Sequence, residues 1–242
     1  MAQDLSDLTQ ALLQAAKAAG ADAADAMAID GTSVSINVRQ GALEHAERSE
    51  GVDIGLRVLI GRRQASVSAS DTRPETLVTM AERAVKMARL APEDPTAGLA
   101  DPSQITDLTD ASALELYDPS DEPNPEQLKD DALRAEAAAL AVKGISQVDA
   151  ASAAYGKRRI HMAATNGFSG GYSRTDRMIS CVAIAGTGTG MERDYCGEGR
   201  IFGVDLPSPE EIGRIAAERT LDRMGPRKPK TGAYPVLYDE RV

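Results

Sequence analysis

The chain has 242 residues, of which 42% are hydrophobic and 26% charged, as in an ordinary folded, soluble protein, so wholesale disorder is excluded. Its 27 Lys and Arg are outnumbered by 37 Asp and Glu, giving a net charge of −10, and only 3% of its residues are aromatic. Because this charge repels a polyanion and base stacking needs aromatic rings, we expect no nucleic-acid partner.

Signals of export and membrane insertion are absent from the sequence. Two cysteines do not make a secreted disulfide framework. The first residues lack a basic region followed by an apolar one, and no apolar run approaches the roughly 20 residues of a membrane span. We therefore expect a cytoplasmic protein with no membrane association.

The first third of the chain predicts two helices around a group of strands. One helix is predicted over 4–19, with Asp4 as its N-cap and Gly20 as its end. The second begins at a capping box, Thr72 to Glu75, and ends before Pro92. Strands are predicted at 34–38, 43–48, 52–60 and 65–69, with turns at 40–41 and 61–62. Such short turns make these strands antiparallel.

A proline-rich acidic connection follows over 92–125, which holds six of the twelve prolines. Within it, 113–117 is predicted as a short strand or tether, and a domain boundary is placed near residue 118.

The second half repeats the pattern of helices and strands. A helix is predicted from a capping box at Asn124 to about Val142, and another from a capping box at Ser208. Strands are predicted at 145–154, 157–164, 168–185, 191–204 and, beginning a further element, 234–238. Turns are predicted at 155–157, 166–167 and 186–190.

The predicted fold class is α+β, with antiparallel sheets packed with helices in two successive units and then the start of a β-rich C-terminal domain. The corresponding boundaries are 1–118, 119–226 and 227–242. Because a new element begins just as the chain stops, we expect a fragment of a longer protein.

Histidine and cysteine, the residues that most often carry chemistry, are scarce. His45 and His161 have no second ligand at metal-binding spacing, so both are interpreted as residues of strand faces. Cys181 and Cys196 flank the glycine-rich turn symmetrically, and a symmetric hairpin places them opposite each other. We interpret them as small buried residues of a reducing compartment, with a redox pair or half a metal site as the alternative.

No motif of the sequence forms a complete catalytic or cofactor site. The glycines at 186, 188 and 190 depart from the dinucleotide-binding pattern, because Met191 stands where its third glycine belongs. Arg57, Arg62 and Arg63 are interpreted as solvated charges, with carboxylate binding as the alternative. The sequence therefore predicts no catalytic, cofactor-binding or metal-binding residue in this chain.

Three segments together resemble the PmbA/TldD family, known as modulators of gyrase or microcin-processing peptidases. They are 49–58 (SEGVDIGLRV) with 61–68 (GRRQASVS), 164–168 (ATNGF), and 232–238 (GAYPVLY). The closing residues 238–242 resemble the PmbA (TldE) branch more than the TldD branch.

The resemblance implies a non-catalytic subunit of a cytoplasmic heteromeric metallopeptidase that cleaves unfolded or extended peptides, as in peptide-antibiotic maturation and antitoxin degradation. The implied partners are a TldD-like subunit, which carries a His-Glu-x-x-x-His zinc motif, and the unfolded peptide, within a homo- or hetero-oligomer. No family metal ligand corresponds to a residue of this chain, so no cofactor is expected here and zinc is expected on the partner.

Two alternatives remain open. One is a regulatory protein-binding module of a gyrase or toxin–antitoxin pathway that acts without proteolysis. The other is the N-terminal part of a TldD-type zinc peptidase, since the zinc motif of that branch follows the segment that matches 232–242.

Overall fold

A computed structural model describes residues 4–106 and 111–241, and its centre is one six-stranded antiparallel sheet. The strand order is β3-β2-β1-β4-β5-β6. The strands are β1 (Ala23–Arg39), β2 (Ala42–Ile60), β3 (Arg63–Ala69), β4 (Ile145–Ala164), β5 (Ser169–Ala185) and β6 (Glu192–Arg200). The helices are α1 (Leu5–Ala19), α2 (Pro74–Leu90), α3 (Pro125–Ala141) and α4 (Pro209–Asp222). The α+β class is confirmed.

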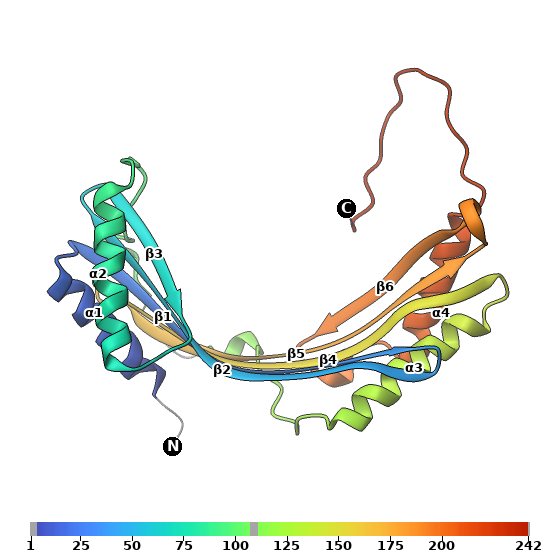
Figure 1. Cartoon of the computed structure of the whole chain (residues 1–242), viewed down its shortest axis with the longest axis horizontal. Helices are drawn as coiled ribbons and strands as arrows, with labels where there is room; N and C mark the ends of the chain where they lie inside the picture. Colours follow the sequence, from blue (N-terminus) through green and yellow to red (C-terminus); the bar gives the residue numbers. More distant parts are fainter. Residues whose placement is uncertain (1–3, 107–110, 242) are drawn as a thin grey trace.

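The sheet bends into a trough whose two limbs are joined by the long strands β1, β2, β4 and β5 (Figure 1). Helices α1 and α2 lie outside one limb, and α3 and α4 lie outside the other. The two predicted groups of strands thus form one sheet, because β1 pairs with β4 from Asp25↔Ala164 to Val38↔Ala151. The boundary near residue 118 stays a prediction.

Side-chain alternation explains why both helix pairs cover the same face. Successive side chains of a strand point to opposite faces. The buried core residues of β1 all have even numbers: Ala24, Ala26, Ala28, Val34, Ile36 and Val38. The first three pack in the cluster beneath α1 and α2, and the last three in the cluster beneath α3 and α4. The opposite, concave face carries no helix among the described residues.

The acidic connection crosses the helix-bearing face between the two helix pairs. Lys157 of β4 lies over the ring of Tyr117, with its Nζ 5.4 Å from the ring centroid. The backbone N–H of Thr175 donates to Leu116 O at 3.1 Å, and that of Asp118 donates to Thr175 Oγ1 at 2.8 Å. The predicted tether over 113–117 is therefore confirmed, although its regular part is a 3₁₀ turn, Ser112–Leu114.

Local signals located most helix ends correctly. The carboxylate of Asp4 accepts from Ser6 N, and Gly20 has the left-handed φ of 92° that ends a helix. Asn124 and Gln127 form the predicted capping box. The hydroxyl of Ser208 accepts from Glu211 N at 3.2 Å. Each cap satisfies backbone N–H groups that lack a partner within the helix.

The capping box predicted at Thr72 is wrong. Helix α2 begins at Pro74, and its N-cap Arg73 makes no side-chain capping bond. The carboxylate of Asp71 instead accepts from Arg73 N at 3.0 Å and Thr76 Oγ1 at 2.8 Å. A charged carboxylate is a stronger acceptor than a hydroxyl, which explains why the residue before Thr72 organises this turn.

The turn predicted at 155–157 is also wrong, because β4 runs unbroken through it. A Cβ at Gly156 would lie 2.5 Å from Asp176 Oδ2, so the glycine makes room for a carboxylate on the next strand. In the same way, the strands predicted at 43–48 and 52–60 are one strand. A glycine inside a strand can mark the close approach of another group and need not mark a turn.

Two other expectations near the C-terminus are corrected. The strand predicted over 191–204 ends at Arg200, and a 3₁₀ turn follows at Gly203–Asp205. Residues 234–238 form no strand, since the described segment 225–241 has no neighbouring strand to pair with and is exposed throughout. No helix of the described residues has the length and apolar character needed to cross a membrane.

Candidate partner-binding surface

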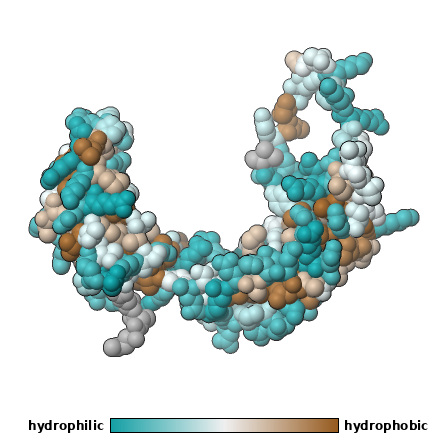
Figure 2. Space-filling view, in the orientation of Figure 1, coloured by the Kyte–Doolittle hydropathy of each residue, from teal (hydrophilic) through white to brown (hydrophobic). Residues whose placement is uncertain are grey.

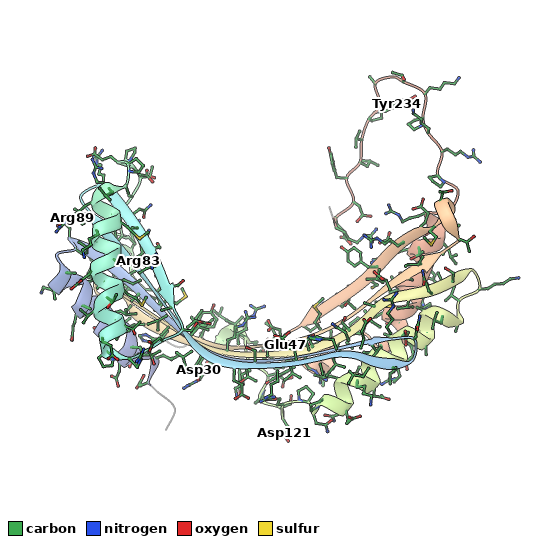
Figure 3. The ribbon with its side chains drawn as sticks, viewed as in Figure 1. Asp30, Glu47, Arg83, Arg89, Asp121 and Tyr234 are labelled. Atoms are coloured by element: carbon green, nitrogen blue, oxygen red, sulfur yellow. The ribbon has the colours of Figure 1, made fainter. Side chains whose placement is uncertain are left out.

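The concave face of the sheet, here called the trough floor, consists of the odd-numbered residues of β1 and their partners on β2, β4 and β5. Glu47 lies at the base of the trough in Figure 3, and Figure 2 shows the hollow between the two limbs, mainly hydrophilic in this view. Across its middle, one row consists of Gly51, Gly31, Arg158 and Arg174. The next row consists of Ser49, Ser33, Gly156 and Asp176.

A free strand edge runs beside this floor. Strand β3 pairs only with Ile54–Ile60 of β2, so the outer side of residues 42–53 has no strand partner in the described part of the chain. Residues 42–51 are exposed on both faces. Backbone N–H and C=O groups along such an edge can pair with an added extended chain.

The structure places the two histidines on different strands and in different surroundings. His45 of β2 is exposed, with its Nε2 3.6 Å from Glu47 Oε2. His161 of β4 is half-buried, and its Nδ1 shares a hydrogen bond with Thr9 Oγ1 at 2.9 Å. Both therefore belong to strand faces, as predicted.

Cys181 and Cys196 are directly opposite each other on β5 and β6, as the symmetric hairpin predicted. Both are free thiols buried in the cluster under α3 and α4. Burial raises the pKa of the Cys181 thiol to about 12 and raises that of Cys196. Because the thiolate is the reactive form, both side chains behave as small apolar residues at neutral pH.

The three candidate arginines have separate partners. Arg57 Nε donates to Asp25 Oδ2 at 2.9 Å, and its Nη1 donates to Gln64 at 3.1 Å. Arg63 bonds the carbonyl of Ala91 and approaches Glu93. Arg62 is exposed in the β2–β3 turn. The first two bind carboxylates of this chain itself, and the three do not form one site.

Metal-binding groups do not converge anywhere in residues 4–106 and 111–241. No three His, Cys, Asp or Glu side chains of these residues are arranged to hold an ion. The only imidazoles are engaged with Glu47 and Thr9, and the two thiols lie together without a third ligand. The donor set of the described chain therefore does not fit a catalytic metal.

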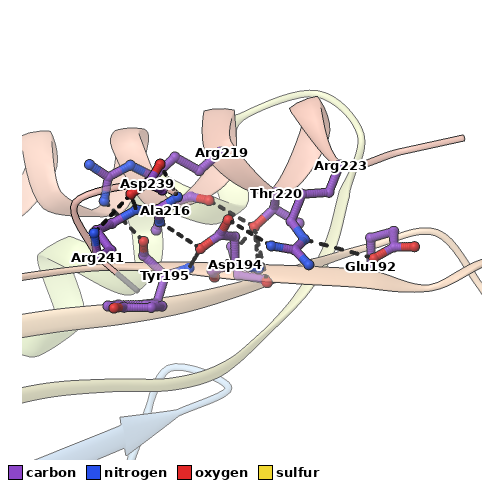
Figure 4. A network of polar contacts seen from close by, with 10 residues as sticks. Glu192, Asp194, Tyr195, Ala216, Arg219, Thr220, Arg223, Asp239 and Arg241 are labelled. Atoms are coloured by element: carbon purple, nitrogen blue, oxygen red, sulfur yellow. Dashed lines mark hydrogen bonds and ion pairs between the residues drawn. The ribbon is translucent and has the colours of Figure 1, made fainter. Parts of the chain in front are cut away.

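No sequence pattern predicted the buried carboxylate that joins β6, α4 and the C-terminal segment (Figure 4). Asp194, only 8% exposed, accepts from Tyr195 N at 2.7 Å and Arg241 Nη1 at 2.9 Å. Arg223 Nη1 lies 3.5 Å away. Burial acts to raise the pKa of Asp194, but these donors outweigh it and hold the pKa below its usual value.

Replacing Asp194 with asparagine is expected to lower the free energy of unfolding at pH 7 by about 1–2 kcal/mol, because a charge-assisted acceptor is lost. The folded pKa lies below the unfolded pKa, so the stabilisation is complete above about pH 4 and is lost as the pH falls through the folded pKa. Urea denaturation of both proteins at pH 7 and pH 3 measures this. A difference of equal size at both pH values would contradict it.

The C-terminal segment leaves the body of the molecule and returns to it through Arg241, whose guanidinium lies over the Tyr195 ring at 5.8 Å. Before the chain returns at Arg241, Tyr234 lies on an extended loop far from the sheet (Figure 3). Leu237 is 98% exposed and Tyr238 is 81% exposed. An apolar run this exposed is typical of a segment that packs against something else.

Two family models match the chain. The PmbA/TldA metallopeptidase domain 1 matches residues 24–88, and the PmbA/TldA metallopeptidase central domain matches residues 118–224. Together they cover most of the chain.

Two curated bacterial proteins are similar to the chain. Metalloprotease PmbA of Escherichia coli O157:H7 is 33% identical over 225 residues, which are 91% of this chain and 49% of that protein. The metalloprotease PmbA homolog of Haemophilus influenzae is 28% identical over 246 residues, covering 98% of this chain and 52% of that protein. The chain thus spans about half the length of the curated relatives it matches.

Solved structures share the fold. A candidate modulator of DNA gyrase from Bacteroides thetaiotaomicron has a TM-score of 0.75 and 22% identity, over 93% of this chain and 51% of that one. TldE from Thermococcus kodakarensis has a TM-score of 0.67 and 15% identity, over 88% and 47%. At these identities the likeness concerns the fold alone.

Proposed function

We propose a function from one premise: the chain belongs to the PmbA/TldD metallopeptidase family. The protein that contains it is a PmbA (TldE)-type subunit that binds unfolded or extended peptides and leaves hydrolysis to a zinc-bearing, TldD-like partner. Residues 227–242 open its C-terminal domain, and the complex works in the cytoplasm.

The observation that carries this proposal is the free edge of β2 beside an open trough floor. An extended peptide that pairs with this edge gains backbone hydrogen bonds that depend little on its sequence. A folded protein has already used those backbone groups within its own sheets and helices. Selection of unfolded substrates follows from this requirement without any side-chain recognition.

The proposal is tested with the full-length protein and a TldD-like protein of the same organism. We expect the two to copurify and the pair to cleave an unfolded peptide, whereas the full-length protein alone, supplied with zinc, does not cleave it. Cleavage by the purified protein alone would contradict the non-catalytic role and favour the TldD-type alternative. Association without any cleavage would favour the regulatory alternative.

Two proline variants test the edge itself. Ala46→Pro and Glu47→Pro each remove one N–H of β2, and neighbouring N–H groups point to opposite sides of a strand. One variant therefore removes an outward N–H, while the other breaks a bond to β1 and lowers the thermal stability. We expect the variant that keeps its stability to reduce peptide cleavage by the pair. Unchanged cleavage by that stable variant would contradict binding at this edge.

A further inference from the structure

Two arginines face each other at the centre of the trough floor. Arg158 of β4 and Arg174 of β5 are direct cross-strand partners, so both side chains rise from the same face. Like charges placed directly opposite each other destabilise a sheet. Arg174 Nε lies 3.5 Å from Asp176 Oδ1. The side chain of Arg158 makes no hydrogen bond or ion pair with another described residue. The structure thus holds an uncompensated positive charge on an open surface.

Arg158 lines a notch together with two glycines, two serines, Ile29, Thr32 and Asp53. Gly31 is its partner on β1, and Gly51 is the partner of Gly31 on β2. A Cβ at Gly31 would lie 3.6 Å from Arg158 Cγ, whereas a Cβ at Gly51 would meet nothing within 4 Å. The arginine therefore leans across β1, over a notch of about 180 Å³. A water needs ~30 Å³, so the notch has room for a group of several heavy atoms.

Two hydroxyl groups line the same notch. Ser33 and Ser49 are cross-strand partners in the row next to the two glycines. Neither hydroxyl bonds another described residue. Asp53 lines the other side, where its Oδ1 accepts from Ser70 Oγ at 2.6 Å. One guanidinium and two hydroxyl groups can donate hydrogen bonds to the oxygens of a bound anion. The negative charge of the nearby Asp53 repels anions, so a singly charged anion is favoured over a doubly charged one.

We infer that this notch binds a single carboxylate of an extended peptide, either an acidic side chain or the C-terminal carboxylate. The inference deepens the proposed function and rests on it for the peptide. The guanidinium of Arg158 binds the carboxylate, and the hydroxyls of Ser33 and Ser49 donate to its oxygens. The bound anion also relieves the repulsion between Arg158 and Arg174.

The test measures binding to the full-length protein without a TldD-like partner, by fluorescence anisotropy. Three labelled, unstructured peptides share one backbone: one neutral and amidated, one amidated with a single internal Glu, and one neutral with a free C-terminus. We expect the Glu peptide, the free-acid peptide or both to bind about tenfold more tightly than the neutral one. The stronger of the two charged peptides identifies the source of the carboxylate.

Arg158→Gln is expected to remove this tenfold difference between the charged and the neutral peptides. The matched control Arg62→Gln removes another exposed arginine, in the β2–β3 turn, and is expected to keep the difference. Circular dichroism melts verify that both variants fold. Equal binding of all three peptides to the wild type, or an undiminished difference in Arg158→Gln, would overturn the inference. Binding of the neutral peptide tests the proposed function separately, because pairing with the β2 edge does not involve Arg158. A neutral peptide that does not bind at all would contradict the proposed function and not the carboxylate site.

Discussion

Replacing Gly213 with alanine is expected to lower the free energy of unfolding by about 3 kcal/mol. A Cβ at this position of α4 would lie 2.1 Å from Ala135 O and 3.0 Å from Ala139 N, both in the backbone of α3. Backbone atoms cannot turn aside as a flexible side chain does, so the two helices must separate. Their separation would open the core formed by Ala132, Ala216 and Ala217.

The sign of this effect opposes helix propensity. Alanine stabilises the interior of a helix by about 1 kcal/mol relative to glycine. If the two helices did not touch, Gly213→Ala would therefore raise the free energy of unfolding. Urea denaturation of Gly213→Ala and of Gly98→Ala measures the difference. Gly98 is an exposed loop residue whose Cβ would meet nothing within 4 Å, so its variant should unfold like the wild type. An unchanged or raised stability of Gly213→Ala would contradict the close crossing of α3 and α4.

Replacing Glu136 with glutamine is expected to lower the free energy of unfolding by about 2–3 kcal/mol, because a buried carboxylate loses one of its two charge-assisted hydrogen bonds to backbone N–H groups. Glu136 of α3 is 2% exposed. Its Oε1 accepts from Gln40 N at 2.6 Å and its Oε2 from Gly41 N at 2.8 Å. These two residues form the β1–β2 turn, with φ values of 55° and 72°. A glutamine amide would accept one bond and present its NH₂ group to the other N–H.

Hydrogen exchange locates the effect of this change. We expect the amides of Gln40 and Gly41 to exchange faster in Glu136→Gln, with urea denaturation giving the loss of stability. Glu82→Gln on the exposed side of α2 is the matched control, since its only ion pair with a described residue is a 3.9 Å contact with Lys86. A Glu136→Gln protein as stable as this control would show that the carboxylate does not hold the turn.

Local signals were sufficient for the parts of the fold that depend on neighbours in sequence. Caps at Asp4, Asn124 and Ser208 were predicted because each satisfies N–H groups within three residues. The opposed cysteines followed from the symmetry of one hairpin around its turn. In each case the residues that interact lie within about twenty positions of each other, so residue types and their spacing are enough to predict the contact.

Strand β1 shows where such signals fail. Its predicted strand, 34–38, has alternating branched residues, whereas the preceding stretch from Ala23 to Ala28 is mostly alanine, which has low strand propensity. Those alanines form strand because they pack beneath α1 and α2, where larger side chains would not fit. The prediction therefore captured less than half of a 17-residue strand.

The sequence by itself determined the α+β class, the family, the starts of three of the four helices and the absence of a recognisable catalytic motif, because these depend on short patterns of residue types. Only the tertiary structure decided that the two groups of strands form one trough, since β1 and β4 pair across more than a hundred residues. The same long-range pairing brings Gly31, Gly51 and Arg158 into one notch and carries Glu136 to the β1–β2 turn. No local pattern can specify these contacts, because they depend on the register of strands distant in sequence and on the packing of helices against the sheet.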